Sequence, residues 1–220
     1  MKNASQHPDS GFTLIELVIV AALISMVAAW SFPTLHRKAR QGEVDRYTQT
    51  IETGIFSLRS KLGTTRTSCE LSFLKPNTFL QPSELLEIQQ PDGSQASNRR
   101  ICCLNKNLEE FIPENSVGDC IDNLNTNLPR MFRLIQREGS SESSAVNVAV
   151  SATSFEMTPP GTSANTQSLT IRIRSRNQND AAVLKSDGSS RLITRCIQVS
   201  GTGSILSGNW DDQLATCLAN

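Results

Sequence analysis

The sequence predicts an α+β protein in which one long N-terminal helix packs on an antiparallel β-sheet domain. Three features predict this fold: an apolar run over 12–32, an amphipathic segment over 41–62, and strand-like alternation in the last third of the chain. The 220 residues are enough for one compact domain beyond a membrane helix. The formal net charge is zero, so overall charge indicates no particular partner.

The apolar run is long enough to cross a membrane. A hydrocarbon core about 30 Å thick takes roughly 20 apolar residues as a helix, and Phe12 to Phe32 consists mostly of leucine, isoleucine, valine and alanine. A secretory signal peptide is the competing interpretation, but its apolar region is shorter, about 7–15 residues, and follows a basic region. Here the leader has Lys2 against Asp9, although Ala28-Ala29 mimics a cleavage site.

Glu16 is the only ionisable residue within this run. An acidic side chain deep in a bilayer costs about 2.5–3.5 kcal/mol, so such residues usually have a partner or a task. One interpretation is that Glu16 lies near the helix end and reaches the headgroups. The other is a functional role, which the surrounding residues favour.

The residues from Gly11 to Val18 read GFTLIELV. This pattern resembles the class III signal of type IV pilins and type II secretion pseudopilins, and it implies a pilin-like fold. The resemblance also implies that a prepilin peptidase cuts between Gly11 and Phe12 and then methylates the new amino group of Phe12. In this family the carboxylate at the position of Glu16 pairs with a free N-terminus, its own or a neighbour's. At an effective dielectric of about 20, opposite charges 4 Å apart attract by roughly 4 kcal/mol, enough to set subunit register.

The signal and the composition divide the chain into five segments. We expect a cleaved leader peptide over 1–11, a transmembrane and filament-core helix over 12–33, and an amphipathic continuation over 34–62. An irregular cysteine-containing region over 63–145 and an antiparallel β-domain over 146–220 complete the chain.

The amphipathic segment has apolar residues three or four positions apart, at Val44, Tyr47, Ile51, Ile55, Leu58 and Leu62. That spacing predicts one buried stripe on a helix. Gly63 is the expected end of the helix, and Gly42 and Gly54 weaken its outer half.

Pro33 is the expected helix kink, because proline removes one helical hydrogen bond. The alternative is simple punctuation at the membrane surface. His36, Arg37, Lys38 and Arg40 follow it, on the side opposite to the usual positive-inside bias.

The middle of the chain gives weaker signals. We expect a short helix over 83–88, a strand over 130–135 and a flexible linker or turn over 140–144. The polar residues between these segments are typical of loops.

The last third alternates between apolar and polar residues. Strands are expected over 146–150, 154–158, 169–174 and 191–199, with a tight turn at 201–203. Such runs separated by turn residues predict antiparallel hairpins with one buried face. Roughly the last 70 residues resemble, by a loose pattern, the β-domain of GspH/FimT-type minor pilins. Ser204 departs from that pattern, because many relatives have a basic residue there.

Six cysteines follow the membrane segment: Cys69, Cys102, Cys103, Cys120, Cys196 and Cys217. An even number on the exported side favours disulfides over buried free thiols, which are the alternative. We expect a Cys196–Cys217 bond that holds the C-terminal tail, with the other four pairing among themselves. No Cys-x-x-Cys occurs, and the two histidines lie in the leader and at the membrane edge, so no metal site is expected.

No catalytic constellation is present in the sequence. No histidine remains in the exported domain to serve a serine or cysteine nucleophile. Gly201-x-Gly203 lacks the third glycine of a dinucleotide loop, and Asp211-Asp212 supplies too few ligands for calcium. We therefore expect neither enzymatic activity nor a cofactor.

A basic stripe accompanies one predicted strand. Arg172, Arg174 and Arg176 fall on one face, opposite Ile171 and Ile173. Lys185, Arg191 and Arg195 follow along the chain. The three arginines are candidate contacts for phosphates of extracellular DNA. The alternative is a solvated face, favoured because the nearby sequence supplies no aromatic partner for stacking bases.

Together these features predict a minor pilin or pseudopilin, a structural subunit that helps to initiate or cap a type IV pilus or type II secretion pseudopilus. Its expected partners are the prepilin peptidase/methyltransferase, other pilins or pseudopilins, the inner-membrane assembly platform and, before assembly, membrane lipid. We expect a single-pass inner-membrane protein with an exported C-terminal domain that later enters the filament. One alternative is a binding module for DNA uptake or adhesion that uses Arg172, Arg174 and Arg176. Another is an ordinary membrane-anchored domain with no filament role.

Overall fold

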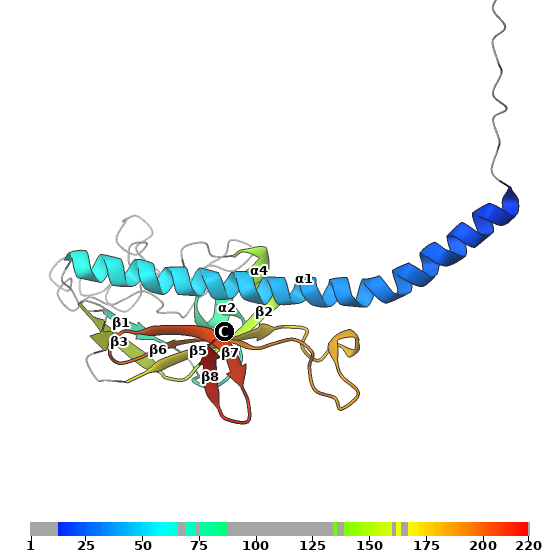
Figure 1. The fold of residues 1–220 in the computed structure, drawn as a ribbon. Helices are drawn as coiled ribbons and strands as arrows, with labels where there is room; N and C mark the ends of the chain where they lie inside the picture. The colour runs from blue at the N-terminus through cyan, green and yellow to red at the C-terminus, as the bar shows by residue number, and fades with distance from the viewer. Residues whose placement is uncertain are drawn as a thin grey trace, which may run out of the picture.

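The computed structural model describes residues 13–65, 69–73, 75–87, 134–135, 139–159, 162–163 and 167–219. Its elements are α1 (Leu14–Thr65), β1 (Cys69–Ser72), α2 (Pro82–Leu85), α4 (Ser141–Ala145), β2 (Val146–Val150), β3 (Ser154–Thr158), β4 (Thr162–Ser163), β5 (Leu169–Ser175), η2 (Ala181–Val183), β6 (Arg195–Val199), β7 (Ile205–Asp211) and β8 (Thr216–Ala219). Figure 1 shows the C-terminal half of α1 along one face of the sheet and its N-terminal half extending beyond it. The predicted α+β fold is confirmed.

Helix α1 runs without interruption through Pro33 and curves over its N-terminal half (Figure 1). It ends two residues beyond the expected stop at Gly63, so that prediction was wrong. In the last turn the hydroxyl of Thr64 donates to the carbonyl of Ser60, one turn earlier in the helix, at 2.7 Å.

The amphipathic stripe of α1 is the centre of the hydrophobic core. All six of its predicted members are at most 2% exposed. They pack with apolar side chains of β2, β5 and β6. Along β5 these side chains alternate with polar residues. A fully buried side chain of this kind contributes about 1.5–3 kcal/mol, so this stripe attaches the helix to the sheet.

The main sheet has five antiparallel strands in the order β2-β5-β6-β7-β8. On β5 the side chains of Leu169, Ile171 and Ile173 are buried, and those of Arg172 and Arg174 lie on the opposite face. Strand β6 begins at Arg195, four residues later than expected. The amide of Leu192 bonds to the Ser190 hydroxyl and that of Ile193 to Gln41 of α1, so this segment does not join the ladder.

A smaller sheet has the order β1-β3-β4. Its strand β1 and helix α2 lie in the segment expected to be irregular, and α2 corresponds to the short helix predicted over 83–88. The linker predicted over 140–144 is a one-turn helix instead, because the Ser140 side chain caps it by accepting from the Ser143 amide. Of the strand expected over 130–135, only Leu134 and Ile135 are described, and these two buried residues are not in a strand.

Candidate functional site: the helix N-terminus and the outer sheet face

Glu16 caps the N-terminus of α1 together with Thr13. The Thr13 amide and hydroxyl each donate to Oε2 of Glu16 at 2.8 Å, and the Glu16 amide is 3.4 Å from the Thr13 hydroxyl. This reciprocal arrangement is a capping box, and Thr13-x-x-Glu16 is its sequence signature. This capping box was not predicted, because the interpretation of Glu16 considered only its charge. The expected cleavage site, Gly11 and Phe12, lies outside the described residues.

The residues after the cap are apolar and exposed. Leu14, Met26 and Val27 are 83%, 71% and 66% exposed, and no described part of the β-domain covers this half of the helix. By length and composition, α1 can cross a membrane, and its most apolar 18 residues have a mean hydropathy of 2.3. Exposed apolar surface of this extent marks a site of contact with lipid or other proteins.

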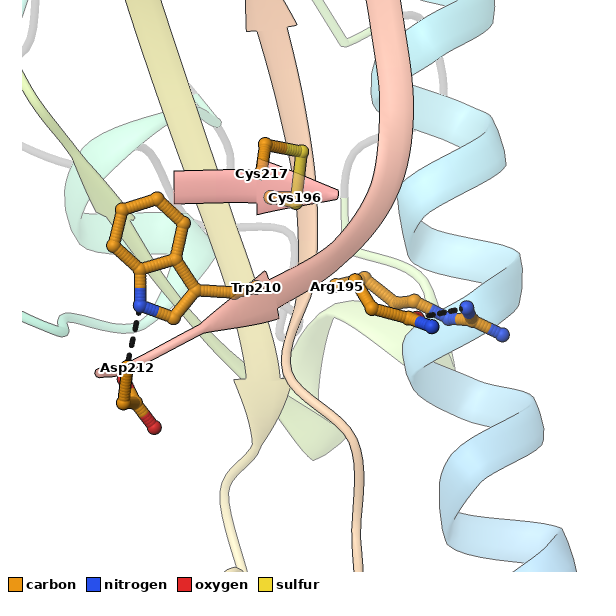
Figure 2. Close-up of a disulfide and its surroundings, with 6 residues drawn as sticks. Arg195, Cys196, Trp210, Asp212 and Cys217 are labelled. Carbon is orange, nitrogen blue, oxygen red and sulfur yellow. Dashed lines mark hydrogen bonds between the residues drawn. A yellow bond between two sulfur atoms is a disulfide. The ribbon is translucent and has the colours of Figure 1, made fainter. Parts of the chain in front are cut away.

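The other half of α1 is joined to the sheet by a polar contact beside the core. Nε of Arg195 on β6 lies 2.7 Å from Oδ1 of Asp45, and Gln41 donates to the same oxygen at 3.1 Å. Arg195 also donates to the side chain of Asn209 on β7. Figure 2 shows Arg195 on the side of the sheet that faces α1, with Trp210 on the other side.

The face of the sheet away from α1 carries the predicted arginines, and the structure corrects the expectation that no ring lies near them. The guanidinium of Arg174 lies 3.8 Å from the centre of the Phe79 ring. The guanidinium of Arg172 lies 5.3 Å from that ring and 4.9 Å from the ring of Trp210. Cation–π contacts of this kind contribute about 0.5–1 kcal/mol each at exposed sites. We call these four residues the arginine–aromatic cluster.

Hydrogen bonds hold the two rings in place. Leu80 exchanges backbone hydrogen bonds with Val148 of β2, which positions the neighbouring Phe79 beside the sheet. The indole Nε1 of Trp210 donates to Asp212 at 2.9 Å (Figure 2). Sequence reasoning missed both rings, because each comes from a segment distant from β5.

The electrostatics of the arginine–aromatic cluster are those of a partly buried basic group. Burial lowers the pKa of Arg174, the charge of Asp212 opposes that shift, and the neighbouring charge of Arg172 adds to it. Arg172 donates to the side-chain oxygen of Asn77 at 3.3 Å. Arg176 lies beyond the end of β5, is exposed, and contacts neither ring.

The predicted Cys196–Cys217 disulfide is present and joins β6 to β8, the strands on either side of β7 (Figure 2). Cys102, Cys103 and Cys120 lie outside the described residues, as does the side chain of Cys69. Within the described ranges, no group of three or more histidine, cysteine, aspartate or glutamate side chains could hold a metal ion.

Residues 7–32 match the family model of the prokaryotic N-terminal methylation motif. This motif is the class III prepilin signal of type IV pilins and pseudopilins. The chain is similar to type IV pilins in this signal and in its pilin-like α+β fold. No curated protein and no solved structure matches it.

The methylation motif implies that a prepilin peptidase processes this chain. The signal and the exposed apolar helix are consistent with inner-membrane anchoring followed by pilus assembly. Proteins of the pilin family are typically structural subunits without enzymatic activity.

Proposed function

We propose that this type IV pilin-like protein is a minor pilin or pseudopilin of the GspH/FimT type, which helps to initiate or cap a filament. The observation that carries the proposal is the division of α1 into two halves. One half is buried against the sheet, and the other presents an exposed apolar surface that begins at the capping box of Thr13 and Glu16. A filament core built of such helices would bury that surface.

The capping box suggests how cleavage would act. Cutting before Phe12 creates an ammonium group directly before Thr13, whose amide is 2.8 Å from the Glu16 carboxylate. The carboxylate then pairs with the amine of its own N-terminus, or it gives up that contact and pairs with the amine of a neighbouring subunit. In either case the charge of Glu16 is neutralised within an apolar environment, where an unpaired carboxylate is costly.

The low-copy role is supported by the exported domain. A disulfide and a cluster of packed arginines and aromatics stabilise the face of the sheet that points away from α1. In a filament whose helices form the core, this face would lie outside and be free for contact at the tip. The exported domain also contains a large, cysteine-containing insertion over 63–145. Such an insertion suits a subunit present in few copies better than one repeated along a shaft.

The test is peptide mass spectrometry of the mature N-terminus in the envelope and in a sheared surface fraction. We expect an N-methylated peptide that begins at Phe12 in both fractions for a pilus, or in the envelope alone for a pseudopilus or an initiator at the base. Glu16→Gln should remain processed and be lost from filaments, whereas the control Glu43→Gln should be incorporated. An intact Met1 terminus or a cut near Ala29 would contradict the proposal.

A second candidate function is DNA binding or adhesion through Arg172, Arg174 and Arg176. Phe79 and Trp210 favour it, because arginines held by stacking keep their donor edges in fixed positions for phosphates. Replacing the three arginines by glutamine should weaken DNA binding and reduce its dependence on salt. The control is Arg59→Gln, at the far end of α1. If the parent binds no DNA, or the triple variant binds equally well, this candidate fails.

A further inference from the structure

Basic residues gather at the end of the β-domain nearest to the apolar half of α1. Residues 34–42 of α1 and the β5–β6 loop over 176–194 together hold six lysines and arginines against two aspartates. The whole chain has equal numbers of basic and acidic residues. The charge is therefore concentrated at this end, which we call the basic collar: Arg37, Lys38, Arg40, Arg176, Lys185 and Arg191.

Hydrogen bonds fix the loop of the collar to the helix. Arg40 forms a 2.8 Å salt bridge with Asp180, which neutralises one of the two acids. Gln41 accepts from the Ile193 amide at 2.9 Å and donates to the Ile193 carbonyl at 3.3 Å. Figure 1 shows the loop projecting from the sheet toward the N-terminal half of α1. The contacts with Arg40 and Gln41 therefore join this loop to α1.

Arg37 donates from Nε to the Pro33 carbonyl at 3.3 Å. The other four basic side chains of the collar are available. Lys38, Arg176, Lys185 and Arg191 are exposed, and none of them forms a salt bridge with a described acidic side chain. Asp187 accepts from the amide and hydroxyl of Ser189, which lowers its pKa; the neighbouring charge of Lys185 contributes less. Ile193, 44% exposed, adds an aliphatic surface to the same loop.

The collar lies at the level of the membrane surface if the apolar run spans the bilayer. At 1.5 Å per residue, Lys38 lies about 9 Å beyond Phe32 along the helix. The polar headgroup layer extends about 5–8 Å beyond the hydrocarbon core, and electrostatic attraction reaches about 8 Å further at physiological salt. Lipid phosphates are therefore within electrostatic reach of Lys38.

We propose that the basic collar docks the exported domain onto anionic lipid headgroups before assembly. The inference rests on the membrane-anchored stage of the proposed function. Docking would hold the β-domain close to the bilayer, with the outer face of the sheet and its arginine–aromatic cluster turned away from α1. Extraction of the helix into a filament would break these contacts, because the collar leaves the headgroup layer with α1.

The experiment places the full-length precursor, one copy per disc, in lipid nanodiscs that contain phosphatidylglycerol or only phosphatidylcholine. Hydrogen exchange of residues 184–190 reports docking of the loop. We expect slower exchange in the anionic discs at about 0.1 M salt and no difference at about 1 M, where the Debye length is about 3 Å. Lys185→Gln with Arg191→Gln should abolish the protection. At about fivefold per charge, the two changes lower the ratio of docked to undocked loop about 25-fold.

The matched control removes two charges from the opposite end of the domain, by Arg59→Gln with Lys75→Gln, and should keep the protection. Equal exchange in the two lipids, or protection that survives the loop substitutions, would overturn the proposal. Protection that requires two copies per disc would also overturn it and assign the collar to a neighbouring subunit. Processing at Phe12 is measured on the same variants. If the protein is cut before Phe12 but its loop shows no protection, docking by the basic collar is refuted and the proposed function is not. If no mature chain begins at Phe12, the proposed function is refuted.

Discussion

Nε of Arg195 lies 2.7 Å from Oδ1 of Asp45, although 150 residues separate them in the sequence. The pair joins β6 to α1 at the edge of the core, where the side chains are 20% and 38% exposed. Gln41 donates to the same carboxylate oxygen and also holds Ile193. The contact therefore connects the helix, the central strand and the β5–β6 loop at one point.

Replacing Asp45 by asparagine should destabilise the protein by about 1 kcal/mol, the upper range for a partly exposed pair. In a chain of this size that lowers Tm by about 2–4 °C. Thermal unfolding of the full chain in detergent measures it. Glu52→Gln, on the same helix, is the control and should have a smaller effect.

The Asp45 contact also predicts a pH dependence. Burial raises the pKa of Asp45, but the hydrogen bonds from Arg195 and Gln41 and the charge of Arg195 outweigh it and lower the pKa overall. An acid with a lowered folded pKa contributes stability above its unfolded pKa of about 3.9 and loses it as the pH falls further. The difference in unfolding free energy between Asp45→Asn and the parent should therefore have its full value near pH 7 and shrink below about pH 4. Parallel stability curves over that range would contradict the assigned contact.

Gly54 and Gly42 should respond in opposite directions to alanine. A Cβ at Gly54 would lie 1.9 Å from the carbonyl oxygen of Leu134, whereas one at Gly42 meets nothing within 4 Å. Gly42→Ala should stabilise α1 by about 0.5–1 kcal/mol through helix propensity. Gly54→Ala should instead cost about 1–3 kcal/mol, because the segment at Leu134 must move. Equal shifts in denaturant midpoint for the two variants would show that Leu134 does not pack on Gly54.

Removing the Cys196–Cys217 bond should destabilise the domain substantially. The two cysteines are 21 residues apart and are 0% and 6% exposed. Closing a loop of this length contributes about 3 kcal/mol in the chain-entropy model. Urea unfolding of a variant with both residues changed to alanine measures the loss. The bond itself is checked by a peptide that links the two segments under non-reducing conditions, and its absence in the parent would contradict the assignment.

Thr13 and Glu16 allow helix capping to be separated from charge pairing. Thr13→Ala removes the cap hydroxyl and should cost about 1 kcal/mol of local helix stability while leaving the carboxylate. Glu16→Gln keeps a residue that suits a capping box but removes the charge. If pairing with an N-terminus drives assembly, only Glu16→Gln should be lost from sheared filaments. Equal loss of both variants would indicate that the cap, rather than the charge, is required.

Much of the fold follows from local patterns. The spacing from Val44 to Leu62 predicts the buried stripe, and the alternation over 169–174 predicts β5 and its buried face. Strands β1, β4, β7 and β8 are not among the predicted strands. In β1 and β8, four residues of mixed polarity carry no period of their own. Their pairing partners, β3 and β7, make them strands. The late start of β6 depends in the same way on Gln41, a residue of α1.

The candidate site likewise has a part that follows from local sequence and a part that does not. The sequence by itself determined the prepilin signal and the membrane-length helix, because each depends on a short continuous segment. The capping box is equally local, since Thr13 and Glu16 are three residues apart, but it was not predicted. Only the tertiary structure decided that Phe79 lies against Arg172 and Arg174 and that Trp210 lies against Arg172. It also decided that the β5–β6 loop contacts Arg40 of α1. Those contacts join segments far apart in the chain. Strand register and helix packing set their distances, and neither leaves a local pattern in the sequence.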